Sequence, residues 1–267
     1  MMIGFLGAGN MASAIMRGMV KNNMPSESIV CYDIDAQKTF ALREELGVVT
    51  CPSAERLCEQ ADVLVLAIKP QVFSAALPAL KETLSKKRPL VISIAAGKTL
   101  DSIAALIGDD LPMVRVMPNI AAAVGEAVSA YCTNALVTQP HVETVYTIFE
   151  SVGTVLPLSE EQFGIFSVLA GCSPAYTLLY MDALATAGVR GGLSKSVALD
   201  IVTQSVIGTA KLLQERDEHP RVLADSVCSP GGTTIEGVCA LAAGGFEKTV
   251  VEAAMASLEK DKKLQNA

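Results

Sequence analysis

The chain has 267 residues, of which 51% are hydrophobic, enough for one or two domains with large cores. Its net charge of −7 argues against nucleic acids and anionic membranes as partners. Seven cysteines without a C-x-x-C pair, and only two histidines, suggest neither a zinc site nor a disulfide framework. We therefore expect no metal and a cytoplasmic location. We also expect no signal peptide, because the amino terminus already belongs to the first strand.

The most informative motif lies close to the amino terminus, where an apolar run at 3–6 is followed by Gly7–Ala12. A strand, a tight glycine turn and the start of a helix are typical of the G-x-G-x-x-G/A dinucleotide site. Gly7 allows the turn, Gly9 lets backbone approach a pyrophosphate, and Ala12 lets the helix pack close to the strand. The motif predicts an oxidoreductase that binds a dinucleotide at a helix start.

Short apolar runs then alternate with helical patterns. We expect strands at 29–32, 48–49, 63–68, 90–94 and 113–117, and helices around 36–46, 71–86 and 99–108. Continuous apolar runs are typical of parallel strands buried on both faces. The alternation predicts an α/β fold with a doubly wound Rossmann sheet, to which 128–132 and 152–156 could add outer strands.

After Pro157 the strand patterns end, and helices are predicted at 160–187, 195–215 and 246–263. We place the domain boundary here, with a dinucleotide-binding domain at 1–158 and an all-helical domain at 159–267. The uncharged segment 163–181 is long enough to suggest a membrane helix, but its small and polar residues and acidic flanks favour a helix buried in protein, partly against a second subunit.

Small or polar residues follow the strands, where ligands gather in open α/β sheets. Asp33 could bind the ribose hydroxyls of NAD, whereas Lys38 could favour the 2′-phosphate of NADP. Asp33 and Asp35 fit turn and helix-cap chemistry equally well, so the cofactor preference stays open. Asn119 could bond the nicotinamide amide.

A second glycine turn lies in the segment 228–236. Ser229-Pro230 is typical of an N-cap followed by proline at the first helical position, and Thr233 with Glu236 of a capping box. Either pattern starts a helix with open N–H groups, a suitable place for a small carboxylate. A capped helix without a ligand is the alternative. No lysine occurs between Lys98 and Lys195, so the site suits a substrate that needs little acid catalysis.

These segments together resemble the pyrroline-5-carboxylate reductase family essentially from end to end. The resemblance rests on GFLGAGNM at 4–11, AIKP at 67–70, SIAAG at 93–97, RVMPN at 115–119, GCSPAY at 171–176 and, most specifically, VCSPGGTTIE at 227–236. It implies reduction of 1-pyrroline-5-carboxylate to L-proline by NAD(P)H, the final step of proline synthesis. It also implies a Rossmann domain, a helical dimerisation domain and a homodimer with active sites between subunits, often within a larger ring of dimers.

The resemblance also assigns roles to residues. Ser229, with the backbone of Gly232 and Thr233 beside Gly231, would hold the substrate carboxylate, and the hydroxyl of Thr234 would bond the ring nitrogen as the catalytic group. We expect NADPH, with NADH possible, to be held by Leu6, Gly7, Ala8, Gly9, Asn10, Met11, Asp33, Ala67, Ile68, Lys69, Pro70, Ala95, Ala96, Gly97 and Asn119. Asp33 departs from the small polar residues of many members, and Ala54 stands where some have asparagine.

Three other roles fit the sequence less well, and one of them, a purely structural oligomer, leaves both glycine turns unexplained. A β-hydroxyacid dehydrogenase has the same two-domain plan but uses a lysine in the early helical domain, where this chain has none. A redox sensor that binds dinucleotide without catalysis leaves the segment Ser229–Thr234 unexplained. A protonated cyclic imine is already a strong electrophile, so its reductase needs mainly to align the substrate and hold its carboxylate.

Overall fold

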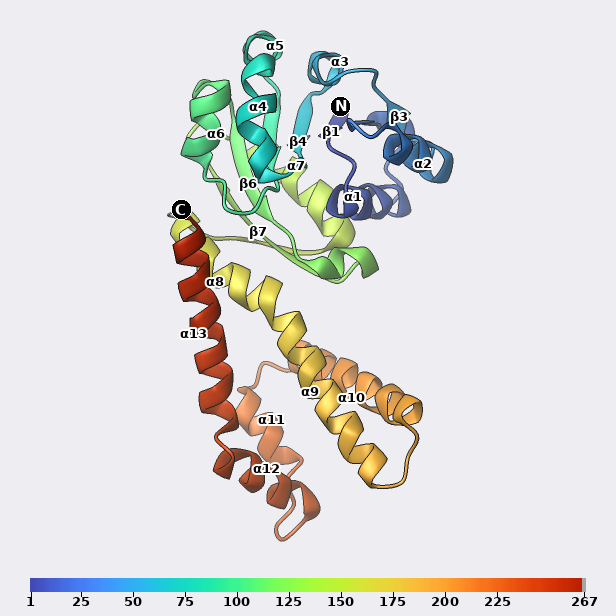
Figure 1. Ribbon diagram of the computed structural model, residues 1–267, viewed down its shortest axis with the longest axis vertical. Helices are drawn as coiled ribbons and strands as arrows, with labels where there is room; N and C mark the ends of the chain where they lie inside the picture. Colours follow the sequence, from blue (N-terminus) through green and yellow to red (C-terminus); the bar gives the residue numbers. More distant parts are fainter. Residues whose placement is uncertain (266–267) are drawn as a thin grey trace. The chain divides into compact units, whose positions relative to one another are not determined.

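The computed structural model describes residues 1–265 and divides into two compact units, Met1–Ser167 and Val168–Lys263 (Figure 1). Each unit is described by itself. The boundary predicted between residues 158 and 159 separates functional parts and stays a prediction. The last two residues of the predicted helical domain, 266 and 267, lie outside the described residues.

The first unit is built on an eight-stranded sheet with the order β3-β2-β1-β4-β5-β6-β7-β8. Its strands are β1 (Ile3–Leu6), β2 (Ile29–Tyr32), β3 (Val49–Thr50), β4 (Val63–Leu66), β5 (Leu90–Ser93), β6 (Met113–Met117), β7 (Ala127–Thr133) and β8 (Gly153–Pro157). Neighbouring strands are parallel except for the antiparallel pair β6 and β7. The strand order runs outward in both directions from β1 and β4, which confirms the doubly wound Rossmann sheet and both outer strands.

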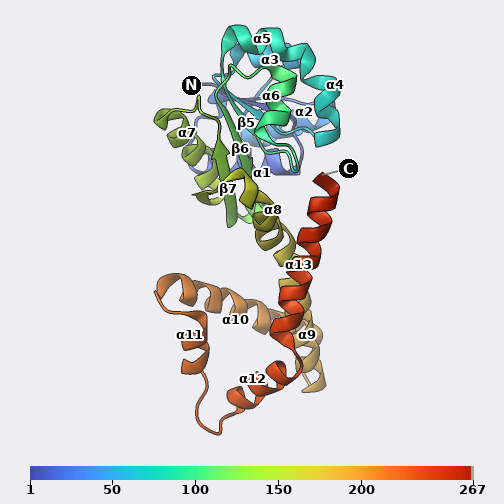
Figure 2. The ribbon, with the colours of Figure 1, turned by 90° about the vertical axis from the view of Figure 1, so that its left-hand side faces the viewer.

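Helices cover both faces of this sheet, and Figure 2 shows α7 and α4 on opposite sides of it. The helices of the unit are α1 (Asn10–Lys21), α2 (Ala36–Leu46), α3 (Ala54–Gln60), α4 (Phe73–Ala76), α5 (Lys81–Lys87), α6 (Leu100–Ile107), α7 (Gln139–Phe149) and α8 (Phe163–Phe166). The helices predicted at 36–46 and 99–108 are confirmed to within one residue at each end.

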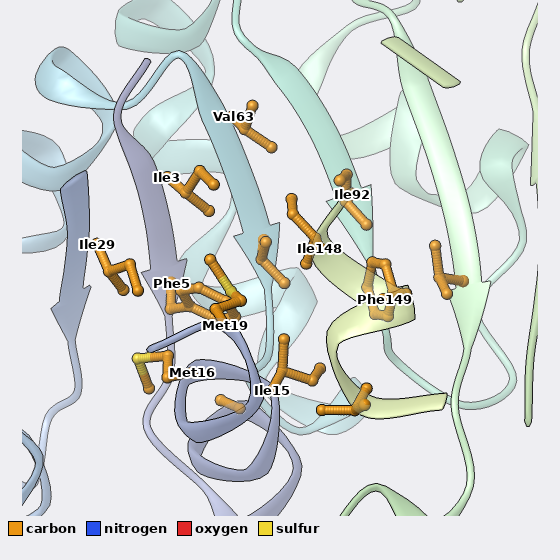
Figure 3. Close-up of a cluster of buried hydrophobic side chains, with 14 of the residues drawn as sticks. Ile3, Phe5, Ile15, Met16, Met19, Ile29, Val63, Ile92, Ile148 and Phe149 are labelled. Atoms are coloured by element: carbon orange, nitrogen blue, oxygen red, sulfur yellow. The ribbon is translucent and has the colours of Figure 1, made fainter. Parts of the chain in front are cut away.

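Side chains at alternate positions of the strands enter different cores, as the two-residue period of a strand requires. On one face, Phe5 of β1 and Ile92 of β5 pack with Met16 of α1 and Phe149 of α7 (Figure 3). On the other face a Cβ added to Gly4 would lie 2.8 Å from the Cβ of Ala61, directly after α3. Helix α3 therefore packs directly on the backbone of β1.

The helix predicted over 71–86 is wrong as one element. A 3-10 turn, Pro78–Leu80, separates α4 from α5. Proline has no N–H for the helical hydrogen bond, and its ring clashes with the preceding turn, so the chain bends there. The helices α3 and α7 were not predicted. The start of α7 carries a sequence mark, since Thr138 and His141 form a reciprocal capping box.

The second unit, which confirms the helical second half of the fold, continues a π-helical segment, Ser167–Cys172, into α9 (Ser173–Arg190). It then contains α10 (Lys195–Glu215), α11 (Pro220–Ser226), α12 (Thr233–Ala243) and α13 (Phe246–Gln265). Helices α9 and α10 form a hairpin, and a Cβ on Gly188 would lie 2.8 Å from the Cβ of Ala198. The ammonium of Lys195 joins them, 2.7 Å from Asp182 Oδ1. Of these helices, α11 was not predicted.

The helical unit leaves most of its apolar surface uncovered. Its buried apolar residues, within the described part of the chain, are Val168, Ala170, Ala185 and Ala198. Large apolar side chains such as Leu178 and Leu179 of α9, Ile201 of α10 and Val251 of α13 are exposed in the single chain. In the single chain only the first part of the segment 163–181 is covered, and its burial partly against a second subunit stays a prediction. An apolar surface of this extent marks an interface.

Two helical stretches, Glu160–Arg190 and Lys195–Glu215, have the length and apolar composition of membrane-spanning helices. Helices that are covered by protein have the same length and composition, so these two stretches do not indicate a membrane.

Gly18 sets how closely α1 approaches the chain before β8. A Cβ at Gly18 would overlap the side chain of Val152 and lie 2.7 Å from the carbonyl oxygen of Ser151. We predict that Gly18→Ala lowers the free energy of unfolding by about 1–3 kcal/mol through overpacking, despite the better helix propensity of alanine.

The measurement is the thermal unfolding midpoint of the whole chain. Lys21→Ala, at an exposed position of the same helix, is the control and should change stability by no more than about 0.5 kcal/mol. A Gly18→Ala variant as stable as this control would contradict the close packing.

Candidate functional site

The carboxyl ends of four parallel strands meet at one edge of the first unit. Leu6 of β1 is in register with Tyr32 of β2 and with Leu66 of β4, which in turn is in register with Ser93 of β5. The segments that follow these strands, 7–12, 33–38, 67–70 and 94–97, are called the cofactor edge below. The strand order changes direction between β1 and β4, which is where ligands bind in open α/β sheets.

Gly7 makes the tight turn possible, as predicted. Its N–H donates to the carbonyl oxygen of Tyr32 at 2.7 Å, and its φ of +108° is a conformation that side chains disfavour. A Cβ at this position would lie 2.6 Å from the carbonyl oxygen of Ala67. Three strand ends are thus held together by backbone alone, and no other residue fits at Gly7.

Gly9 has a different reason to be glycine. It stands at the N-cap of α1 with an extended backbone (φ −75°, ψ 179°), which any residue could adopt, and a Cβ there would meet no atom within 4 Å. No side chain caps α1, and its first turn contains no acidic residue. The first N–H groups of the helix therefore face open space, which is the arrangement that binds phosphate at a helix N-terminus.

Asp33 braces the glycine turn. Its Oδ2 accepts a hydrogen bond from the N–H of Ala8 at 2.8 Å, and its Oδ1 accepts from the N–H of Asp35 at 2.9 Å. Asp35 in turn caps α2 by accepting from the N–H of Gln37 at 3.1 Å. The turn and helix-cap chemistry considered for this pair is present. Ribose binding by Asp33 stays a prediction.

Lys38 brings a positive charge to the same edge. Its Nζ lies 3.7 Å from Asp33 Oδ1 and 3.8 Å from Asp35 Oδ2, and half of its side chain is exposed. Half of the Lys38 side chain is in contact with solvent, and surface ion pairs of this kind are weak. The ammonium group therefore remains available to another anion.

Two cavities lie along the cofactor edge. One, of about 410 Å³, is lined by Gly9, Asn10, Met11, Ala12, Lys38, Ala67, Ile68, Lys69, Pro70, Ile94, Ala95 and Ala96. The other, of about 450 Å³, shares Gly9, Lys38 and 67–69 with the first and continues past Leu6, Asp33 and Ala54. Because the first cavity contains the start of α1 and both cavities contain Gly9 and Lys38, together they suit an extended dinucleotide with its phosphates at the start of α1.

Four of the predicted cofactor residues do not line either of these cavities. Gly7 and Ala8 form the turn beneath them, and Gly97 lies on the exposed part of its loop with a φ of +72°. Asn119 follows β6, and its Oδ1 accepts a hydrogen bond from the N–H of Val128 at 3.2 Å. Lys38, which the sequence analysis weighed only for cofactor preference, lines both cavities.

The second glycine turn lies in the helical unit, before α12. The N–H of Gly232 donates to the carbonyl oxygen of Ser229 at 3.0 Å, and Gly231 has a φ of +68°. A Cβ at Gly232 would overlap the hydroxyl oxygen of Ser229. The positive φ favours glycine at Gly231, whereas a side chain at Gly232 would require the Ser229 hydroxyl to move from its place beside the backbone of Gly232.

Helix α12 starts at Thr233, with Gly232 at the N-cap, and no side chain caps it. Both predicted caps are therefore wrong. Ser229 and Pro230 belong to the turn before the helix, and Thr233 is already the first helical residue, one position too late to cap. The first N–H groups of α12 stay open. The hydroxyl of Thr234, in the exposed first turn, forms no hydrogen bond with any other described residue.

The described part of the chain contains a buried cysteine near the cofactor edge and no cluster of metal ligands. Burial raises the pKa of Cys31, on β2, to about 11, so this thiol is neutral at physiological pH. Within residues 1–265 no group of three or more His, Cys, Asp or Glu side chains is arranged to hold a metal ion.

Comparison with known families and proteins covers nearly the whole chain. The family "Pyrroline-5-carboxylate reductase dimerisation" matches residues 160–264, and "NADP oxidoreductase coenzyme F420-dependent" matches residues 2–97. The pyrroline-5-carboxylate reductase of Escherichia coli (strain K12) is 38% identical, with 99% of this chain and 98% of the relative covered. The enzyme of that name from Arabidopsis thaliana is 36% identical, covering 99% and 96%.

Solved structures of pyrroline-5-carboxylate reductases have the same fold as this chain. A pyrroline-5-carboxylate reductase from Coxiella burnetii has a TM-score of 0.94 and 32% identity, covering 98% of this chain and 97% of its own. The pyrroline carboxylate reductase of Plasmodium falciparum with NADP bound has a TM-score of 0.86 and 31% identity, covering 99% and 98%.

Sequence similarity to pyrroline-5-carboxylate reductases extends over 99% of the chain, so a hydroxyacid dehydrogenase and a redox sensor no longer fit. The chain belongs to the pyrroline-5-carboxylate reductase family, and it is an oxidoreductase that reduces 1-pyrroline-5-carboxylate to L-proline, the final step of proline biosynthesis.

Proposed function

We propose that the reaction is divided between the two glycine turns. The turn at Gly7–Ala12 and the cofactor edge hold NADPH, with NADH as a weaker alternative. The turn at Ser229–Thr234 holds the substrate. The observation that carries this division is that both turns precede an uncapped helix of at least eleven residues, and each leaves its first N–H groups open to an anion.

The cofactor, when bound, supplies the hydride. Gly9 and the first turn of α1 receive its phosphates because no Cβ and no capping side chain stand in the way. We propose that Lys38 pairs with a 2′-phosphate, while the Asp33 carboxylate holds the N–H of Ala8 in the turn. The small side chains at 67–70 and 95–97 let the cofactor lie against backbone, and Asn119 is proposed to bond the nicotinamide amide.

The substrate turn provides an anion site and an orienting hydroxyl. The Ser229 hydroxyl and the N–H groups of Gly232 and Thr233 bind the substrate carboxylate, with Gly231 supplying the left-handed turn. The Thr234 hydroxyl bonds the ring nitrogen and fixes which face of the imine is presented. Because the iminium form is already electrophilic, positioning supplies most of the rate enhancement.

The second part of this proposal concerns assembly. We infer that two copies of the chain pair through the helical unit and that active sites form between subunits, within a dimer or a larger ring of dimers. The uncovered apolar faces of α9, α10 and α13 support a second copy as the partner. The seven free cysteines fit a reducing, cytoplasmic location. In this proposal, residues 1–158 bind the cofactor, and the chain from 159 binds substrate and dimerises.

Gly9→Ala separates cofactor binding from folding. Since the new methyl group meets no protein atom, we predict a small change in thermal stability. The Kd for NADPH should rise about tenfold or more, a loss of ~1.4 kcal/mol, because the methyl group occupies the path of the pyrophosphate. Fluorescence titration of NADPH measures this, and a Kd within about twofold of the unmodified protein would refute the phosphate site.

Lys38→Gln tests the cofactor preference. We expect the Kd for NADPH to rise about fivefold or more and the Kd for NADH to stay nearly unchanged, because the lost charge would face only the 2′-phosphate. Lys21→Gln, at the exposed end of α1, is the matched control and should affect neither. If the Kd for NADPH and the Kd for NADH rose by the same factor, Lys38 would not bind a 2′-phosphate.

Thr234→Val and Thr234→Ser test the substrate turn. Valine keeps the shape and removes the hydroxyl, so kcat/KM for pyrroline-5-carboxylate should fall about 10- to 100-fold, while serine should retain most of it. The Kd for NADPH should be unchanged in both, since the residue lies in the other turn. If Thr234→Val kept the original rate and substrate binding, the role of the hydroxyl would be wrong.

A further inference from the structure

Arg115 is a buried cation on a central strand of the first unit. Only 4% of its surface is exposed, and its neighbours in the sheet are Ser93 of β5 and Cys132 of β7. Its Nε is buried without a hydrogen-bond partner among the described residues. Burying a guanidinium is costly, and an ion pair in such a place is weak evidence for stability. Its presence therefore calls for another role.

Two groups from the chain after β8 meet this guanidinium. Nη1 of Arg115 lies 3.0 Å from Oε1 of Glu160, and the guanidinium carbon lies 4.5 Å from the ring centroid of Phe163. The Cys132 thiol nearby is neutral, because burial raises its pKa to about 11. Glu160 is therefore the anionic partner of Arg115.

Glu160 also contacts the start of α6. The same Oε1 atom accepts a hydrogen bond from the N–H of Leu100, the first residue of α6, at 3.0 Å. Beside it, the hydroxyl of Thr99 caps the helix by accepting from the N–H of Ser102 at 3.1 Å. An N–H at a helix start has no partner within the helix, so an outside carboxylate satisfies it.

The segment that precedes α6 is part of the cofactor edge. At its first end, the N–H of Ile94 donates to the carbonyl oxygen of Leu66 at 3.2 Å, which ties it to β4. Ala95 and Ala96 then line the 410 Å³ cavity, and Gly97 turns the chain with a φ of +72°. At its second end, the Leu100 N–H is held by Glu160. The loop is thus fixed at both ends, and the second anchor depends on Arg115.

We propose that Arg115 and Glu160 are positioning residues for the cofactor, because together they fix the start of α6 and keep 94–97 against the cavity. The inference rests on the proposed cofactor site. Glu160 is also the first residue matched by the dimerisation family. The pair therefore joins the cofactor edge to the segment with which the dimerisation region begins.

Glu160→Ala, Glu160→Gln and the control Glu161→Ala test the proposal. Glu160→Ala leaves the buried Arg115 guanidinium without its anionic partner and should lower stability, so the thermal unfolding midpoint is measured beside both readouts. Glu160→Gln keeps a hydrogen-bond acceptor for Arg115 and is the variant closest to the native fold, and Glu161 is the exposed neighbour. The first readout is hydrogen exchange of the protein without cofactor. Peptides covering 94–102 should exchange about fivefold faster in Glu160→Ala, while peptides of β1 and α1 stay unchanged.

The second readout separates binding from turnover. Glu160→Ala should raise the Kd for NADPH about three- to tenfold with little change in kcat. Glu160→Gln should fall between Glu160→Ala and the unmodified protein, because its amide oxygen still accepts from the Leu100 N–H but has lost the charge that pairs with Arg115. Glu161→Ala should match the unmodified protein in both readouts.

The proposal is overturned if Glu160→Ala and Glu161→Ala agree in exchange and in Kd, or if the Kd rises without faster exchange at 94–102. If the unmodified protein failed to bind NADPH, the proposed cofactor site and this positioning role would both fall. The exchange data would then still show whether Glu160 holds α6, so the two failures are distinguishable.

Discussion

The cofactor edge depends on the close approach of two backbones, at Gly7 and at Ala67. A Cβ at Gly7 would sit 2.6 Å from the carbonyl oxygen of Ala67, so β1 and β4 can end side by side only if the turn has no side chain. The Gly7 N–H bonds the end of β2, and the Asp33 carboxylate bonds the next N–H of the turn. With the turn fixed in this way, α1 starts with its first turn lining the 410 Å³ cavity and Gly9 lining both cavities.

The helical unit is governed by a different constraint, which is that its helices cover only a small part of their own apolar surface. Four small or medium apolar residues are buried in it, while leucines, isoleucines and valines of α9, α10 and α13 remain exposed in the single chain. A surface of this kind becomes stable when a second copy covers it. The helices beside the turn at Ser229–Thr234 carry this uncovered surface, which is why the proposed function includes pairing through the helical unit.

The sequence predicted those features that rest on local rules. Glycine spacing at Gly7 and Gly9, continuous apolar runs for buried strands and the change of pattern after Pro157 all led to elements that the structure confirms. Interactions between residues far apart in the sequence could not be predicted. Nothing local to Asp33 shows that its carboxylate bonds Ala8, or that Glu160 bonds Leu100 sixty residues earlier. The start of α12 was misjudged because Thr233 and Glu236 fit a capping pattern, whereas the helix begins one residue earlier with Gly232 at an uncapped N-cap.

The central claim is that one subunit holds the hydride donor and its partner holds the acceptor. The most direct measurement is complementation between Gly9→Ala and Thr234→Val subunits, co-expressed and assayed at an NADPH concentration at which each variant alone is slow. If active sites form between subunits, mixed dimers contain one site free of both substitutions. The mixture should then recover about one quarter of the unmodified activity, as random pairing in a symmetric dimer requires. If each chain builds its own site, no intact site can arise, and activity no higher than the average of the two variants would contradict the account.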